Sequence, residues 1–167
     1  MEVGNFDAIN VGDEISLEKG PTTRDQLKKY AKASGDVNPI HTTPAVAEKA
    51  GLGDVISHGL FNMAHVNHML ADWAGPDGMV KMIDVQMRSM GRPDDMLISK
   101  GKITKKYEED GKKIVDLDVW QESKTLVTPE KEEKGYFKEG DEYITEGDDK
   151  FRIQKTVIVG TASVILP

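Results

Sequence analysis

The sequence predicts an α+β fold in which an antiparallel sheet wraps around one long helix. Three observations lead to this prediction. An apolar helical stretch lies at about residues 59–73, the second half of the chain has several alternating strands, and residues 9–57 hold only short elements. No internal repeat is evident, and 167 residues fit one domain, so we expect a single domain over residues 1–167.

The N-terminal part begins with a short strand at residues 15–17. Thr23 followed by Gln26 matches a capping box, in which each residue bonds the backbone N–H of the other, and it predicts the start of a helix. That helix should end near Gly35. Pro44 suits the first turn of a further short helix through residue 50.

The long helix at 59–73 is apolar on most of its circumference. Leu60, Ala64 and Asn67 lie on one line of helical spacing, and other apolar residues fill the adjacent face. A helix of this kind is usually covered on several sides. We therefore expect it to be the central helix of the domain.

The strands follow the long helix, at about 82–88, 97–105, 114–120 and 155–166. The clearest is 114–120, where apolar and acidic residues alternate as they do in a half-buried strand. Its inward side is predicted to consist of Val115, Leu117 and Val119. Antiparallel pairing of these strands would supply the sheet.

An acidic segment at residues 122–150 separates the last two strands. The stretch 129–150 holds nine acidic and four basic residues, and so carries −5 of the chain's net charge of −7. It is too polar for a core. We expect a long hairpin protrusion or a mobile loop, inserted before the last strand.

Composition excludes several classes of function. A net charge of −7 argues against nucleic acid as a partner, because phosphate binding requires clustered Lys and Arg. The chain has no cysteine, which excludes disulfides, thiolate catalysis and cysteine-ligated metals. No apolar run approaches the ~18 residues of a membrane span. The first residues lack a basic start and an apolar stretch, so we expect no signal peptide and a cytoplasmic location.

The residues that point to chemistry are Asp36 and His41. Pro39 lies between them and disfavours a regular helix, so the chain must turn and can bring the carboxylate and the imidazole to one point. His58, in the tripeptide Ser57-His58-Gly59 at the start of the long helix, comes seventeen residues after His41. An acid and a base on a loop beside a helix start form a plausible catalytic arrangement.

These residues resemble a known signature. Residues 34–41, Ser-Gly-Asp-Val-Asn-Pro-Ile-His, followed by residues 57–60, Ser-His-Gly-Leu, are similar to the motif of the MaoC-like (R)-specific enoyl-CoA hydratases and hydroxyacyl-thioester dehydratases. The resemblance covers about residues 8–120 and resumes at the last strand. It implies a single hot-dog domain, in which an antiparallel sheet wraps one central helix.

The resemblance implies a lyase that hydrates trans-2-enoyl thioesters or dehydrates (R)-3-hydroxyacyl thioesters. Asp36 and His41 would hold the water and move its proton, as general acid–base groups do. The Gly59 N–H, at the positive end of the long helix, would donate a hydrogen bond to the thioester oxygen as it gains charge. Glycine allows the thioester to approach the backbone closely.

Four further residues are expected near the substrate. They are Asn38, which would also hold the loop, Ser57, His58 and Asn67. His58 is expected to anchor the helix start more than to take part in chemistry. Asn67 stands where many of these hydratases carry a small hydroxyl residue on the central helix, and the spacing alone sets that register.

Two other functions stay open. The chain can be the catalytic or pocket-shaping subunit of a heteromeric hot-dog dehydratase that acts on bulky or carrier-protein-bound acyl groups. A hot-dog thioesterase is a weaker alternative, since such enzymes carry a carboxylate on the central helix and this helix offers only Asp72, near its end.

The expected partners follow from this chemistry. The substrate would be an acyl-CoA or acyl carrier protein thioester, and no metal or other cofactor is expected because the proton transfers need none. Lys81, Arg88 and Arg92 are candidate phosphate contacts that the sequence does not rank. A single hot-dog exposes a sheet edge, so we expect a homodimer or a heterodimer with another hot-dog subunit.

Overall fold

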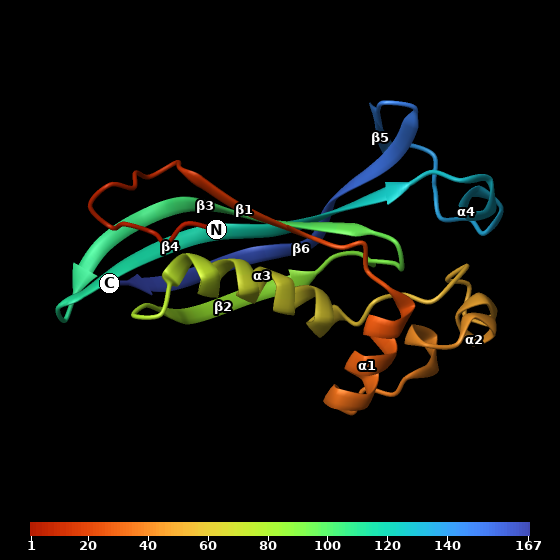
Figure 1. Ribbon diagram of the computed structural model, residues 1–167, viewed down its shortest axis with the longest axis horizontal. Helices are drawn as coiled ribbons and strands as arrows, with labels where there is room; N and C mark the ends of the chain where they lie inside the picture. Colours follow the sequence, from red (N-terminus) through yellow and green to blue (C-terminus); the bar gives the residue numbers. More distant parts are fainter.

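The structure is a computed structural model that describes all 167 residues, and its centre is a six-stranded antiparallel sheet around one long helix. The strand order is β1-β3-β4-β6-β2, and β5 pairs with the far end of β6. The strands are β1 (Glu14–Lys19), β2 (Met79–Met87), β3 (Met96–Glu109), β4 (Lys112–Leu126), β5 (Glu142–Glu146) and β6 (Asp149–Leu166). Figure 1 shows the helix α3 (Gly59–Ala74) lying along the sheet.

The core lies between α3 and the sheet. Val66, Met69, Leu70 and Trp73 of α3 are buried among inward-facing residues of β3, β4 and β6. The alternation predicted for 114–120 is confirmed, since Val115, Leu117 and Val119 are all buried. Val66, Met69, Leu70 and Trp73 follow helical spacing on one face, and burial of that apolar face is the main force that holds α3 on the sheet.

The prediction that α3 is covered on several sides is wrong for this chain alone. Leu60, Ala64 and Asn67 form the outer stripe of the helix and are exposed. The apolar pattern is nearly continuous around the helix, so it could not show which stripe faces the sheet.

Three shorter helices precede α3: α1 (Arg24–Ser34), the 3₁₀ turn η1 (Pro39–His41) and α2 (Pro44–Lys49). The predicted capping box is confirmed, because Thr23 and Gln26 bond each other's backbone N–H groups. Gly35 ends α1 with a φ of 79°, a left-handed conformation that glycine adopts without strain. These caps fix where the loop after α1 begins.

The strands extend further into the acidic segment than predicted. β4 continues to Leu126 and β6 begins at Asp149, while β5 and the short helix α4 (Pro129–Glu133) lie between them. The extension was missed because its inward side is polar. Gln121, Ser123 and Thr125 alternate along β4 and are fully buried, so no apolar period marks them.

One edge of the sheet is β2, which pairs only with β6. Its exposed large apolar residues are Met79, Met82 and Met87. Exposed edge strands offer unpaired backbone groups to another chain. No helix of the protein is both long enough and apolar enough to cross a membrane.

Candidate active site

The loop between α1 and α2 brings Asp36 and His41 together. Gly35 ends α1, and the Asp36 N–H then bonds the Ser34 hydroxyl at 3.2 Å. Asn38 caps η1, its side-chain oxygen accepting from the Ile40 N–H at 3.3 Å. Pro39 begins this 3₁₀ turn, as its fixed φ allows. Asn38 therefore holds the loop, and the turn predicted between Asp36 and His41 is present.

The two side chains approach without touching. His41 Nε2 lies 3.9 Å from Asp36 Oδ2, which is longer than a hydrogen bond and suits a bridging water. His41 is buried, whereas the Asp36 side chain is 52% exposed. His41 Nδ1 lies 2.8 Å from the Ile56 carbonyl, which can only accept, so Nδ1 carries the proton. The basic nitrogen Nε2 is thereby left facing the Asp36 carboxylate.

His58 stacks on His41 and ties the loop to the start of α3. The two rings have centroids 3.9 Å apart, and His58 Nε2 donates to the Asp36 carbonyl at 3.1 Å. Burial lowers the pKa of His58, and the neighbouring His41 lowers it further. A neutral His58 is therefore favoured, with its proton on Nε2. This contact agrees with the anchoring role expected for His58.

The N-terminus of α3 faces the same place. Gly59 is the first residue of the helix, where backbone N–H groups have no acceptor within the helix, and His58 gives no side-chain cap. A Cβ at Gly59 would lie 3.2 Å from Met87 Cγ, so a larger residue here would crowd the end of β2. Ser57 is fixed by its N–H to the Gly91 carbonyl at 2.9 Å.

Asn62 is a site residue that the sequence reasoning missed. It is 2% exposed, and its side-chain oxygen accepts from the Ser57 hydroxyl at 2.8 Å. Its carbonyl accepts from Gln121 of β4 at 3.0 Å. A polar side chain three residues after Gly59, inside an otherwise apolar face, was the signal that could have found it.

A cavity of about 320 Å³ lies beside His41 and the start of α3, and Asp36, Asn38 and His58 are outside its lining. Its lining consists of His41, Ile56, Ser57, Gly59, Asn62 and the segment 87–90. The His41 ring and the first turn of α3 are therefore open to one ligand, while the end of β2 forms the opposite wall.

Asn67 corrects one of the predicted site residues. It is exposed on the outer stripe of α3 and does not line the cavity. At 1.5 Å rise per residue, Asn67 lies about 12 Å along the helix from Gly59. The sequence prediction placed the polar residue of the site too far along α3. Asn62, about one and a half turns earlier, supplies the amide beside the cavity.

Asp36, His41 and His58 also form a group whose ligand atoms lie within 4.8 Å of one another, close enough for a metal ion. Each imidazole already uses one nitrogen on a backbone carbonyl. Only His41 Nε2, His58 Nδ1 and the carboxylate would be left to bind a cation.

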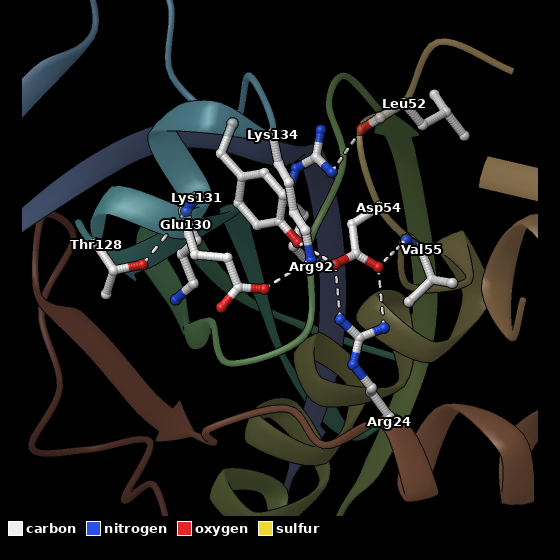
Figure 2. A network of polar contacts seen from close by, with 10 residues as sticks. Arg24, Leu52, Asp54, Val55, Arg92, Thr128, Glu130, Lys131 and Lys134 are labelled. Atoms are coloured by element: carbon white, nitrogen blue, oxygen red, sulfur yellow. Dashed lines mark hydrogen bonds and ion pairs between the residues drawn. The ribbon is translucent and has the colours of Figure 1, made fainter. Parts of the chain in front are cut away.

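A buried ionic network supports the segment that leads into Ser57 (Figure 2). Asp54 is 1% exposed and receives two hydrogen bonds from Arg24, at 2.9 and 2.7 Å. Lys134 and the Tyr136 hydroxyl, both from the acidic segment, reach the same carboxylate at 3.2 and 2.9 Å. Burial alone would raise the pKa of Asp54, but these bonds and the Val55 N–H hold it well below its usual range. The acidic segment thus packs against the chain segment that leads into Ser57.

Comparisons with known proteins show the family to which the chain is similar. Residues 8–125 match the family described as MaoC like domain. Over 100 residues the chain is 31% identical to the fatty acid synthase subunit beta of Saccharomyces cerevisiae, which covers 59% of this chain and 5% of that protein. The chain therefore spans a small part of that much longer relative.

Solved structures share the fold. An (R)-hydratase from A. caviae involved in PHA biosynthesis superimposes with a TM-score of 0.69 at 18% identity, over 96% of this chain and 98% of that one. The ChsH1-ChsH2 complex from Mycobacterium tuberculosis gives a TM-score of 0.62 at 17% identity, over 95% and 98%. These likenesses confirm the hot-dog fold.

Proposed function

The chain belongs to the MaoC-like dehydratase family, and from this premise we propose that it is a lyase that reversibly hydrates trans-2-enoyl thioesters to (R)-3-hydroxyacyl thioesters. The observation that carries the proposal is that His41 and Gly59, the first residue of α3, line one cavity. The Asp36 carboxylate lies outside that lining but 3.9 Å from the free Nε2 of His41.

Water would be activated between Asp36 and His41. Their separation of 3.9 Å leaves room for a water that donates to the carboxylate and to Nε2. The water oxygen forms a bond to Cβ of the enoyl group, and its proton passes to the pair. The same pair then delivers a proton to Cα, so that H and OH are added to one face. Because the Ile56 carbonyl fixes the tautomer, His41 can accept a proton without first turning its ring.

The thioester oxygen would bind at the start of α3. As water adds to Cβ, negative charge moves onto this oxygen, and the Gly59 N–H together with the helix dipole stabilises it. Ser57 and Asn62 would hold the thioester beside that N–H, since both line the cavity and bond each other. Asn38 and His58 would keep the Asp36 loop in place.

The chain is proposed to work as one hot-dog domain over residues 1–167 that pairs with a second hot-dog chain. The edge strand β2 exposes Met79, Met82 and Met87, and α3 exposes Leu60. The related fold named above was solved as the two-protein ChsH1-ChsH2 complex. A second copy of the chain or a different hot-dog subunit would cover these exposed apolar residues. With a different subunit, the enzyme would be a heteromeric dehydratase.

The proposal is tested by turnover of short-, medium- and bulky-chain trans-2-enoyl-CoAs. We expect loss of the enoyl group and formation of the (R)-3-hydroxyacyl product, with the thioester intact. Release of free CoA would instead indicate a thioesterase. No turnover of any acyl length, by the chain alone and with a hot-dog partner, would contradict the proposal. Molar mass in solution gives the assembly that the assay uses.

A further inference from the structure

A second, partly enclosed cavity of about 70 Å³ lies between the acidic segment and the loop that follows β2. Two arginines line it, Arg92 from that loop and Arg152 from β6. The remaining lining residues are Met90, Gly135, Tyr136, Lys138, Asp141 and Gln154. Met90 also lines the active-site cavity, so the two hollows are neighbours.

Both arginines are buried without an ion pair. Each is 6% exposed, and no carboxylate oxygen lies within 4.0 Å of either guanidinium. Arg92 donates to the Leu52 carbonyl at 2.8 Å, as Figure 2 shows, and packs over the Tyr136 ring. Arg152 donates to the Thr125 hydroxyl at 3.1 Å and to the Tyr136 carbonyl at 3.4 Å. All these partners are neutral.

Arg152 also has a donor without a partner. Its Nε–H is buried and bonds nothing in the structure. A buried charge is costly unless an opposite charge and hydrogen bonds compensate it, and an unmet donor adds to that cost. Two buried guanidiniums without an ion pair beside one cavity, one of them with an unmet donor, are therefore suited to binding an anion.

The nearby acidic groups do not neutralise this charge. Asp95 is fully buried and reaches Arg152 only through the Thr125 hydroxyl, from which it accepts at 2.6 Å. Burial raises the pKa of Asp95 to about 6, so that its negative charge is itself poorly stabilised. Asp141 accepts from the Lys138 N–H at 2.9 Å. Arg92, Arg152 and Lys138 thus outnumber Asp95 and Asp141 around the cavity.

We propose that this cavity binds a tetrahedral oxyanion of the phosphate class, held by the guanidiniums of Arg92 and Arg152. Arginine presents planar pairs of N–H donors that match phosphate oxygens. A phosphate would accept from the free Arg152 Nε–H and compensate both charges. The phosphate comes either from the carrier arm of the thioester, a source that rests on the proposed function, or from free phosphate in solution.

Binding is measured by titrating inorganic phosphate into the full chain by calorimetry, at ionic strength held constant with chloride. We expect saturable binding that weakens by roughly ten- to hundredfold in Arg152→Gln, the cost of losing charged hydrogen bonds. Lys112→Gln is the matched control, because it removes an exposed cation from the opposite end of β4. It should bind phosphate as the unchanged chain does.

The phosphate-binding experiment can overturn this proposal without any measurement of catalysis. If the unchanged chain shows no saturable phosphate binding, or if Arg152→Gln binds equally well, the proposal is wrong. Should Arg152→Gln not fold, Lys138→Gln, on the exposed wall of the cavity, gives the same comparison with a smaller expected loss.

Two substrates then identify the source of the phosphate. If the substrate's own phosphate occupies the cavity, Arg152→Gln raises KM for an enoyl-CoA but not for the matching enoyl-pantetheine, which has no phosphate. If KM is unchanged for both while phosphate binding is lost, the cavity binds free phosphate. If the unchanged chain turns over neither substrate, the proposed function fails and the phosphate titration still decides the anion site.

Discussion

Tyr136 donates its hydroxyl to the buried carboxylate of Asp54 at 2.9 Å, across 82 positions of sequence. One partner lies in the acidic segment and the other lies three residues before Ser57. Both side chains are buried, and Arg24 and Lys134 share the carboxylate. The acidic segment therefore supports the residues that lead into Ser57 and α3.

Replacing this hydroxyl should destabilise the protein. In Tyr136→Phe the ring remains but buried Asp54 loses a donor, and we expect the free energy of unfolding to fall by about 1–3 kcal/mol. Urea unfolding measures the change. Tyr143→Phe is the control, because Tyr143 is partly exposed and its hydroxyl makes no hydrogen bond in the structure. Equal stability of Tyr136→Phe and the unchanged protein would show that the contact is weak.

Asp95 should make stability fall as pH rises. Its pKa, raised by burial to about 6, lies above the unfolded value of about 3.9, so the folded state retains a proton that the unfolded state has released. This contribution is fully present below about pH 4 and is lost as the pH passes 6. Its size is on the order of 2–3 kcal/mol.

The measurement is urea unfolding at pH 4.5 and pH 7, in phosphate-free buffer, for the unchanged protein and Asp95→Asn. The stability difference between the two proteins should shrink, or reverse in favour of Asp95→Asn, at pH 7. Comparing the two proteins removes the contributions of His58 and the other titrating groups. A difference that is the same at both pH values would contradict the account.

The sequence alone was sufficient for the fold and for the proximity of Asp36 and His41. Caps such as Thr23 and Gln26 and the alternation at Val115 to Val119 are local signals, and they were correct. The fully buried Asp54 and the polar inward face of β4 were not predictable, because their burial depends on partners distant in sequence. Asn67 was misplaced for the same reason, since no local pattern shows which stripe of α3 faces the sheet.

Asn62 and Asn67 make a matched pair on α3. Asn62→Ala removes the partner of Ser57 and should lower kcat/KM by roughly ten- to hundredfold, because small displacements in a site are costly. Asn67→Ala lies on the exposed stripe and should stay within about twofold. Steady-state hydration of one enoyl-CoA compares the two. A larger loss of kcat/KM in Asn67→Ala than in Asn62→Ala would instead support the position near the substrate that the sequence predicted for Asn67.

Gly59→Ala should impair chemistry more than folding. Alanine suits the first turn of a helix, but its Cβ would stand beside the N–H that is proposed to bind the thioester oxygen. We expect kcat to fall on the order of 10²–10³-fold. The added Cβ also meets Met87 Cγ at 3.2 Å. If Gly59→Ala with Met87→Ala recovers the rate, the collision and not the lost approach is the cause.

The central claim is that Asp36 and His41 together activate water, and it is tested most directly by the hydration rate of Asp36→Asn. Asparagine keeps the size of the side chain but cannot take a proton, so kcat should fall by roughly 10²–10⁴-fold while thermal stability is unchanged. Asp25→Asn, an exposed change on α1, should keep the full rate. A near-full rate in Asp36→Asn would contradict the mechanism, even if the protein is a hydratase.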